Sequence, residues 1–317
     1  MNELEQYKFF AIVGVGRSGT SLLMSMLNAH PLISLPPETH FIDRYVINRP
    51  WKKTYDLVNT LETDHRFRRL NLDKQDINEL AFRIGANLKP ANIYKEILRL
   101  YAEKKGVKII GDKAPKNIEY LPVLRQLYPG GWLIHIIRDP RDVYLSRTKA
   151  AWSSSRSDLS HLIAYRSQYR LGQRFGKKLF GSKYHEIKYE NLLSHPELEL
   201  SKICELLSVP FDEAMLEYSK SSHELVSPEE MAWKKETLEP IIADNVNKWR
   251  DGLTGDKVAL IETVCSRPFR DGLYKTTQEV NILKIFALNL YFGAVSTLYQ
   301  CWVVFKNWSA LITLPRE

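Results

Sequence analysis

Residues 14–21, GVGRSGTS, have the spacing of a phosphate-binding loop but not its lysine. In the pattern G-x-x-x-x-G-K-[ST] the lysine reaches the β- and γ-phosphates of a nucleoside triphosphate, and here Thr20 takes its place. Glycines let consecutive N–H groups face an anion, and the positive end of the following helix adds to the attraction. The loop's side-chain donors are Arg17, Thr20 and Ser21. The loop therefore predicts a phosphate site without the triphosphate machinery; the alternative is an ordinary glycine-rich turn.

A second motif, RDPRDVYLSR at residues 138–147, predicts another anion site. Asp139 suits the cap of a helix and Pro140 its first turn, so a helix amino terminus follows an apolar run directly. The donors around that terminus are Arg138, Arg141 and Ser146. Two anion sites favour a ligand with more than one phosphate group. The alternative is that the two arginines form salt bridges with the neighbouring aspartates.

The elements that must position these residues alternate between strands and helices. The short apolar runs that predict strands are 8–15, 32–35, 107–115, 131–140 and 185–193. Helical segments between them indicate an α/β fold, with a parallel sheet of about five strands covered on both faces. Ligands of such sheets bind beyond the carboxyl ends of the strands, where both motifs lie. Residues 40–105 are predicted to form a helical cap on the substrate side.

Charge and cysteine content narrow the class of partner. The 45 Lys and Arg residues outnumber the 37 Asp and Glu residues, which favours anionic ligands. The basic residues are scattered, so we expect a phosphorylated small molecule and no nucleic acid. Cys204, Cys265 and Cys301 are far apart and lack metal-ligand spacing, which predicts free thiols in a reducing compartment. The first residues do not read as a signal peptide, and we expect a cytoplasmic protein.

Three segments, VGRSGTSLL, RDPRDVYLS and KYENLLSHPE, together resemble the sulfotransferases that use 3′-phosphoadenosine-5′-phosphosulfate (PAPS). The resemblance runs from residue 9 to about residue 275, and residues 11–41 are especially similar to tyrosylprotein sulfotransferases and related bacterial enzymes. It implies a P-loop NTPase-like sulfotransferase fold, PAPS as donor and no metal. A sulfuryl group bears less charge than a γ-phosphoryl group, so cationic side chains and loop amides suffice without Mg²⁺ and the lysine.

The family pattern carries over position by position. The loop residues implied to hold the 5′-phosphosulfate are Arg17, Ser18, Gly19, Thr20 and Ser21. Glu38 takes the place of the general base, and Lys113, with Arg17, that of the cations assisting the leaving phosphate. The other matches are nucleotide contacts: Arg138 and Ser146 for the 3′-phosphate, then Tyr189 and Lys248. Residues 234–243 are implied to close over the nucleotide. The structural alternatives are a helix-start Glu38, a solvated Lys113 and a packing role for Tyr189.

The acceptor is less well specified than the donor. Tyrosylprotein sulfotransferases have an amino-terminal anchor that this sequence does not show, and Ala150 replaces an arginine four residues beyond Ser146. We therefore expect a hydroxyl of a carbohydrate, lipid or small molecule, with protein tyrosine as the alternative. A P-loop kinase is disfavoured by Thr20. A nucleotide-binding protein without activity is disfavoured by the presence of Glu38 and Lys113.

A tail, residues 279–317, follows the predicted catalytic domain, residues 1–278. Residues 285–305 carry no charge, and as a helix they would span roughly 30 Å, the thickness of a bilayer core. Candidate interfacial anchors are Tyr291, Tyr299, Trp302 and Trp308. A stripe of small and polar residues consists of Asn289, Gly293, Ser296 and Gln300. We expect membrane contact at the cytoplasmic face; the alternatives are a helix lying on the catalytic domain and a homodimer interface.

Overall fold

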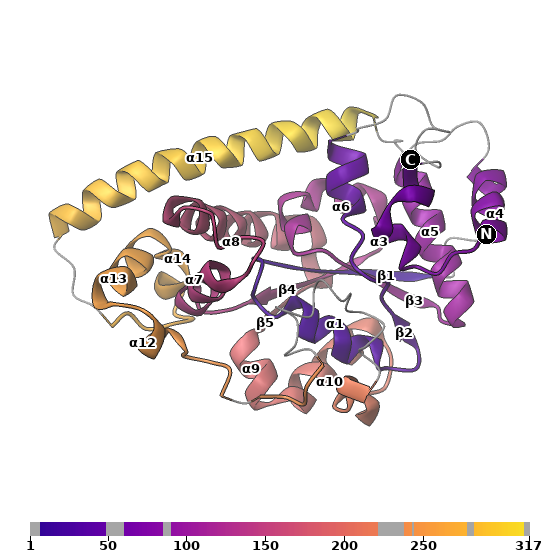
Figure 1. Cartoon of the computed structure of the whole chain (residues 1–317), viewed down its shortest axis with the longest axis horizontal. Helices are drawn as coiled ribbons and strands as arrows, with labels where there is room; N and C mark the ends of the chain where they lie inside the picture. The colour runs from indigo at the N-terminus through magenta and orange to yellow at the C-terminus, as the bar shows by residue number, and fades with distance from the viewer. Residues whose placement is uncertain are drawn as a thin grey trace.

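The structure, a computed structural model, describes residues 7–48, 60–84, 90–220, 238–242, 244–277 and 282–313. At its centre lies one sheet of five parallel strands in the order β2-β3-β1-β4-β5 (Figure 1). The strands are β1 (Lys8–Gly14), β2 (Ile33–Ser34), β3 (Ile109–Lys113), β4 (Trp132–Ile137) and β5 (Tyr184–Lys188). Each overlaps an apolar run that the sequence marks as a strand, so the predicted α/β fold is confirmed.

Strand β1 shows why these residues form a central strand. Phe9, Ala11 and Val13 pack into the core on one face of the sheet, and Phe10 and Ile12 into the core on the other. A strand buried on both faces needs a continuous apolar run, and this segment supplies one. Strand β1 pairs with β3 on one side and with β4 on the other, so the order of the strands reverses there. A ligand-binding crevice is expected at such a point.

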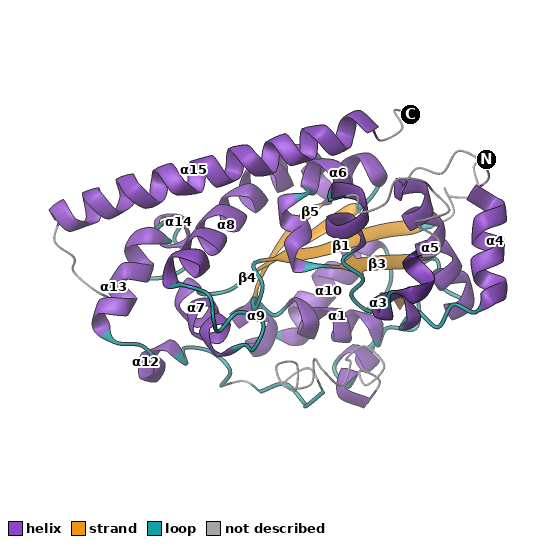
Figure 2. Cartoon of the chain, turned by 45° about the horizontal axis from the view of Figure 1, so that its top comes forward, coloured by secondary structure: helices purple, strands orange, loops and turns teal. Residues whose placement is uncertain are grey.

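Helices cover both faces of the sheet (Figure 2). One face packs against α1 (Thr20–Asn28), α9 (Tyr189–Ser194) and α10 (Pro196–Leu207). The other packs against α5 (Pro90–Lys105), α6 (Leu121–Leu127) and α8 (Asp158–Phe180). A further apolar cluster joins α8 to α7 (Pro140–Lys149) and α13 (Gly255–Val264). The shorter helical elements are η2 (Ile42–Ile47), α3 (His65–Arg68), η3 (Pro115–Glu119), η4 (Gly181–Lys183), η5 (Glu213–Met215), η6 (Tyr218–Lys220), α12 (Trp249–Gly252) and α14 (Arg267–Arg270).

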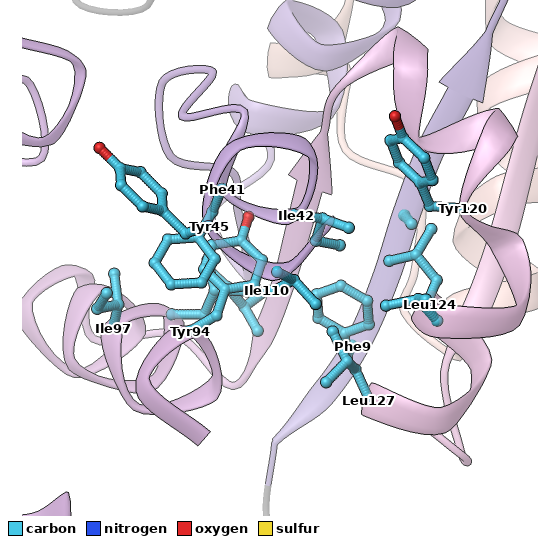
Figure 3. Packing of buried hydrophobic residues seen from close by; sticks show 14 of the residues in the cluster. Phe9, Phe41, Ile42, Tyr45, Tyr94, Ile97, Ile110, Tyr120, Leu124 and Leu127 are labelled. Atoms are coloured by element: carbon cyan, nitrogen blue, oxygen red, sulfur yellow. The ribbon is translucent and has the colours of Figure 1, made fainter. Parts of the chain in front are cut away.

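An aromatic cluster fixes the segment that follows β2 (Figure 3). Phe41 stacks on Tyr94 of α5 with ring centroids 4.6 Å apart, and the centroid of Tyr45 lies 5.2 Å from that of Phe41. Phe9 of β1 belongs to the same buried cluster. Because Phe41 is fully buried against the sheet, the residues just before it are held at the carboxyl ends of the strands.

The described parts of residues 40–105 are helical and comprise η2, α3, α4 (Lys74–Ile84) and α5. Helix α5 also packs against β3, so this part of the predicted cap belongs to the layer that covers the sheet. Residues 49–59 and 85–89 of the predicted cap lie outside the described residues. So do 221–237 and 243, which include half of the predicted closing loop at 234–243.

The tail forms one helix, α15 (Ile282–Thr313), that runs along the outer side of α8 (Figure 1). The hydroxyl oxygens of Ser296 and Ser167 lie 2.9 Å apart, and Arg166 Nη1 donates to Asn289 Oδ1 over 3.2 Å. The small and polar stripe of the tail therefore packs on α8, which is one of the arrangements that the sequence left open. Among the described helices, none combines the length and the apolarity needed to cross a bilayer.

The aromatic residues of α15 divide between its two sides. Tyr291, Trp302 and Trp308 are exposed, as anchors would be. The Tyr299 hydroxyl instead donates to Glu119 Oε1 over 2.7 Å, so this side chain faces the domain. The prediction of Tyr299 as an interfacial anchor is wrong, because the residue lies on the same side of the helix as the polar stripe.

Candidate active site at the carboxyl edge of the sheet

A cavity of about 990 Å³ lies at the carboxyl ends of the strands. Every strand is followed by residues that line it: Gly19 after β1, Glu38 after β2, Pro115 after β3, Arg138 after β4 and Tyr189 after β5. Residues from separate parts of the sequence thus meet at the edge where the sequence predicted a ligand.

The phosphate loop joins β1 to α1 through residues with positive φ. Arg17 has a φ of 80°, and Gly19, which precedes α1, has a φ of 93°. A Cβ on Gly19 would lie 2.3 Å from an atom of the Tyr189 ring, so both the backbone and the packing require glycine. No side chain of the described residues caps α1. The first-turn amides, including those of Thr20 and Ser21, are therefore left for an anion.

Ser18 completes the turn of this loop. Its N–H donates to the backbone oxygen of Val15 over 3.0 Å, and the side chain is buried. Its hydroxyl has no hydrogen-bond partner within the described part of the chain, and Ser18 does not line the cavity. A role for Ser18 in nucleotide binding stays a prediction.

The two anion motifs meet through Arg17. Its Nε donates to Ser146 Oγ over 2.9 Å, and its backbone oxygen accepts from Arg138 Nη1 over 3.4 Å. Asp139 caps α7 as predicted, because its side chain accepts from the N–H of Arg141 over 2.9 Å. The loop expected to hold the 5′-phosphosulfate and the pair expected to hold the 3′-phosphate are therefore parts of one site.

Arg138 is placed by an aromatic ring and by backbone oxygens. Its guanidinium carbon lies 4.2 Å from the centroid of the Tyr189 ring, and Nη2 donates to the backbone oxygen of Asn245 over 2.9 Å. The Asn245 side chain in turn donates to the Tyr189 hydroxyl over 2.8 Å. Arg138 is only 6% exposed, and its Nε has no partner among the described residues. A buried, incompletely paired cation of this kind suits an anionic ligand.

Arg141 has a structural role. Its guanidinium forms ion pairs with Asp139 and with Glu262 of α13, both at 2.6 Å, and lies over the ring of Trp249. The salt-bridge alternative is thus confirmed for Arg141. Arg138 forms no salt bridge within the described residues.

Glu38 and Lys113 form a buried pair beside the loop, and the partly exposed His40 lies against Glu38. Lys113 Nζ lies 2.5 Å from Glu38 Oε2 and 3.4 Å from Ser21 Oγ, while His40 Nε2 lies 3.3 Å from Glu38 Oε1. Lys113 is 1% exposed and Glu38 is 9% exposed. A solvated loop lysine is therefore excluded, and Glu38 precedes the helical segment that begins after Phe41.

His40 combines backbone strain with a shifted titration. Its φ of 54° lies in the left-handed region that residues other than glycine seldom adopt. Burial is the main cause that lowers the pKa of His40, the charge of Lys113 adds to it, and the charge of Glu38 opposes it. The lowered pKa favours the neutral form of the imidazole beside Glu38.

One part of the cavity, which we call the distal half, lies against η3, α8 and α15. Its residues include Asp43, Lys116, Glu119, Arg147, Trp152, Arg156, Gln168 and Tyr299. Glu119 Oε1 accepts from Gln168 Nε2 and from the Tyr299 hydroxyl, each over 2.7 Å. Lys116 pairs with Asp43 at 2.8 Å. The distal half is thus a polar space in the same cavity as Glu38, with room for a second reactant.

Two residues of the site, Arg147 and Asn245, were not predicted from the sequence. Arg147 ends the second motif, but on a helix that turns about 100° per residue it faces another side than Ser146. Asn245 acts partly through its backbone oxygen, which no residue type reveals. Lys248, a predicted nucleotide contact, is exposed at the start of α12 and does not line the cavity.

The geometry suits one ligand with two anionic groups and a second reactant with a proton to lose. The open amides of α1 and the side chain of Arg17 face one anionic group, and Arg138 suits the other. Glu38 lies where the loop meets the distal half, so its carboxylate can take a proton from the second reactant.

Comparisons with known proteins agree with this geometry. A sequence profile described as the sulfotransferase family matches residues 10–213, more than half of the chain. An uncharacterized protein of Aquifex aeolicus is 24% identical over 245 residues, which are 75% of this chain and 30% of that protein. Protein-tyrosine sulfotransferase A of Caenorhabditis elegans is 24% identical over 266 residues, 81% of this chain and 64% of that protein. The chain thus spans less than two thirds of either relative.

A solved structure extends the comparison to the fold. The sulfotransferase domain of the Synechococcus PCC 7002 olefin synthase superposes with a TM-score of 0.59 at 26% sequence identity. The superposition covers 81% of this chain and 94% of that domain.

Proposed function

Since the chain belongs to the sulfotransferase family, we propose that it transfers the sulfuryl group of PAPS to a hydroxyl of a carbohydrate, lipid or small molecule. The donor assignment is supported by two cationic sites that meet at Arg17. The loop suits the 5′-phosphosulfate, and Arg138 with Ser146 suits the 3′-phosphate. Leu193, Tyr218 and Ile241 line the same cavity and offer an apolar surface to the adenine.

The ion pair between Glu38 and Lys113 is the observation that carries the proposal. Lys113 Nζ is shared between Glu38 and Ser21, so it lies between the proposed base and the loop for the leaving phosphate. A nucleotide-binding protein without activity would have no need for a buried carboxylate at this junction.

In the proposed reaction the acceptor oxygen attacks sulfur while Glu38 takes the hydroxyl proton. The bond between sulfur and the bridging oxygen breaks, and its electron pair leaves with the 5′-phosphate of adenosine 3′,5′-bisphosphate. Lys113 and Arg17 offset the charge that develops on that oxygen. Each of these groups belongs to the chain itself.

A protein tyrosine is the second candidate acceptor, because the C. elegans relative carries the name protein-tyrosine sulfotransferase. Incubating a cell extract with ³⁵S-labelled donor separates the two candidates. We expect label in carbohydrate, lipid or small-molecule fractions, whereas label confined to protein that yields sulfotyrosine on hydrolysis would favour the second acceptor.

The tail helix has a proposed partner of its own, the cytoplasmic face of a membrane. The side of α15 that faces away from the domain carries exposed apolar residues along its length, namely Leu290, Tyr291, Leu298, Trp302, Val304, Phe305, Trp308 and Ile312. An exposed stripe of this size marks an interaction surface. Its aromatic and aliphatic composition suits a helix that lies in the plane of the interface, and the net charge of +8 complements anionic headgroups.

The donor assignment predicts that adenosine 3′,5′-bisphosphate stabilises the protein in the presence of EDTA. Both proposed phosphate sites consist of amides and of cationic or hydroxyl side chains, so they need no metal as a bridge. Thermal unfolding with the bisphosphate, compared with ATP and Mg²⁺, checks this. A higher Tm with the bisphosphate in EDTA supports the site, and stabilisation that EDTA abolishes, or that only ATP with Mg²⁺ produces, contradicts it.

A further inference from the structure

Arg147 is a buried cation that has no anionic partner among the described residues. The side chain is 4% exposed, lines the distal half and donates through Nε to His161 Nδ1 over 3.2 Å. Among the described residues, its two terminal nitrogens have neither a hydrogen-bond nor a salt-bridge partner. Glu119 attracts Arg147 electrostatically but lies beyond salt-bridge distance. A guanidinium that lines a cavity without a counter-charge among the described residues suits an anionic ligand that supplies one.

Arg156 brings a second positive charge to the same place. The central carbons of the Arg147 and Arg156 guanidinium groups lie 5.3 Å and 5.9 Å from the centroid of the Trp152 ring. Burial, together with the charge of Arg156, lowers the pKa of Arg147 to about 10. The two positive charges repel one another, and an anion held between them would be attracted by both.

The position of this pair places it beside the reacting groups. Arg147 interacts electrostatically with Tyr299 and Glu119 of the distal half. A Cβ on Gly16 would lie 3.3 Å from Arg147 Nη1, so the guanidinium also borders the phosphate loop. One molecule that occupies the cavity could therefore contact both this pair and Glu38.

We propose that Arg147 and Arg156 bind an anionic substituent of the acceptor, a phosphate, sulfate or carboxylate separate from the hydroxyl that receives the sulfuryl group. Guanidinium groups suit such oxyanions because their planar fork donates two parallel hydrogen bonds. Trp152, Ile163 and Ala164 line the same part of the cavity and provide apolar contact for the body of the acceptor. The acceptor is thus a hydroxyl compound that already carries an acidic group, an inference that rests on the proposed function.

The test uses the full chain saturated with adenosine 3′,5′-bisphosphate, with inorganic sulfate as the probe at constant ionic strength. Calorimetry compares the Kd for sulfate of the wild type with those of Arg147→Gln, Arg156→Gln and Arg250→Gln. Arg250 is the matched control, because it is exposed, lies over the Trp249 ring and does not line the cavity. We expect Arg147→Gln to weaken sulfate binding at least about tenfold, the exposed Arg156 to matter less, and Arg250→Gln to change nothing.

A second arm separates the acceptor from the donor. The affinities of Arg147→Gln for PAPS and for adenosine 3′,5′-bisphosphate should match those of the wild type. A wild type that binds no sulfate, or an Arg147→Gln variant that binds it equally well, would overturn the proposal. So would a selective loss of PAPS affinity in that variant, which would assign Arg147 to the sulfuryl group of the donor. A wild type that binds no bisphosphate would instead refute the proposed function on which the inference rests.

Discussion

At the scale of single residues, substitution of Arg138 is the clearest test of the proposed 3′-phosphate site. The side chain stacks on Tyr189, donates to the backbone oxygens of Arg17 and Asn245, and has an Nε without a partner in the described chain. We predict that Arg138→Ala lowers the affinity for adenosine 3′,5′-bisphosphate about 10- to 100-fold, because a charge-assisted contact contributes about 1.5–3 kcal/mol. The affinity for adenosine 5′-monophosphate should fall much less. Calorimetric titration with both nucleotides measures the difference.

A matched variant separates the charge of Arg138 from its geometry. Arg138→Lys keeps the charge but loses the planar group that stacks and donates in two directions. It should therefore regain only part of the preference for the 3′-phosphate. A variant with alanine at this position that still prefers the bisphosphate as strongly as the wild type would place the 3′-phosphate elsewhere in the cavity.

The sequence indicated those candidate site residues that lie at the end of a strand, in the segment after it or in the loop. Glu38, Lys113 and Arg138 were recognisable because a family pattern fixes them relative to apolar runs. Arg147 and Tyr299 were not, because their role depends on which side of a helix meets the cavity. That choice is made by the packing of α7 and α15, which involves residues far apart in the chain.

At the scale of the elements, the contact of β4 with α8 predicts a dependence of stability on pH. His135 of β4 is buried, its Nδ1 lies 2.8 Å from the Tyr184 hydroxyl, and a Cβ on Gly172 of α8 would lie 2.6 Å from its ring. Burial lowers the pKa of His135 from 6.5 to about 4, against the opposing charge of Glu186.

The sign of the effect follows from proton binding. Between pH 4 and pH 6.5 the unfolded chain binds a proton at residue 135 that the folded chain does not. The folded state therefore loses stability as the pH falls from 6.5 towards 4, and this loss is absent above pH 6.5. Over this whole range, protonation of His135 lowers the free energy of unfolding by about 3 kcal/mol. Burial raises the pKa of Asp112 to about 6, which acts in the opposite sense below that pH. Urea unfolding of the wild type and of His135→Gln is measured across this pH range. Asp112 is present in both proteins, so the difference between their free energies of unfolding reports the effect of the histidine.

We expect the wild type to lose more stability than His135→Gln between pH 7 and pH 5. The glutamine amide can still form a hydrogen bond with Tyr184, so the variant is a fair control for packing and polarity. Parallel losses in the two proteins would mean that His135 titrates normally in the folded state.

The elements differed in how far the sequence determined them. The five strands could be predicted because short apolar runs flanked by polar loops are typical of buried parallel strands. The docking of α15 could not, because a stripe of Asn289, Ser296 and Gln300 suits a polar helix face as well as a partner within a membrane. The stripe docks on α8 because the Ser167 hydroxyl and the Arg166 guanidinium bind it. Only the folded chain places these two groups beside α15.

At the scale of the whole molecule, α15 places its polar side on the domain and its apolar side outward. We predict that the protein cosediments with vesicles containing anionic lipid. Replacing Leu298 and Phe305, which are 71% and 63% exposed, by serine should weaken binding at least about tenfold, since each buried apolar side chain contributes about 1.5–3 kcal/mol. Leu198→Ser is the control, because this exposed leucine lies on α10.

Two outcomes would contradict the membrane assignment. Wild-type protein that stays in solution with such vesicles would exclude it directly. A dimer that dissociates when Leu298 and Phe305 are replaced, without vesicle binding by the wild type, would identify a second copy of the chain as the partner of this face.

The most direct test of the account is the Glu38→Gln variant, measured for transfer and for binding on one preparation. Glutamine keeps the shape of the side chain and an oxygen towards Lys113, but it cannot take the proton of the acceptor at neutral pH. Single-turnover transfer of ³⁵S from bound PAPS to the acceptor fraction should slow about 10²–10⁴-fold, the usual effect of removing a general base. The affinity for adenosine 3′,5′-bisphosphate should stay near that of the wild type, because the loop and Arg138 do not depend on this carboxylate. A variant that transfers at the wild-type rate, or one that no longer binds the nucleotide, would contradict the assignment of Glu38 as the base.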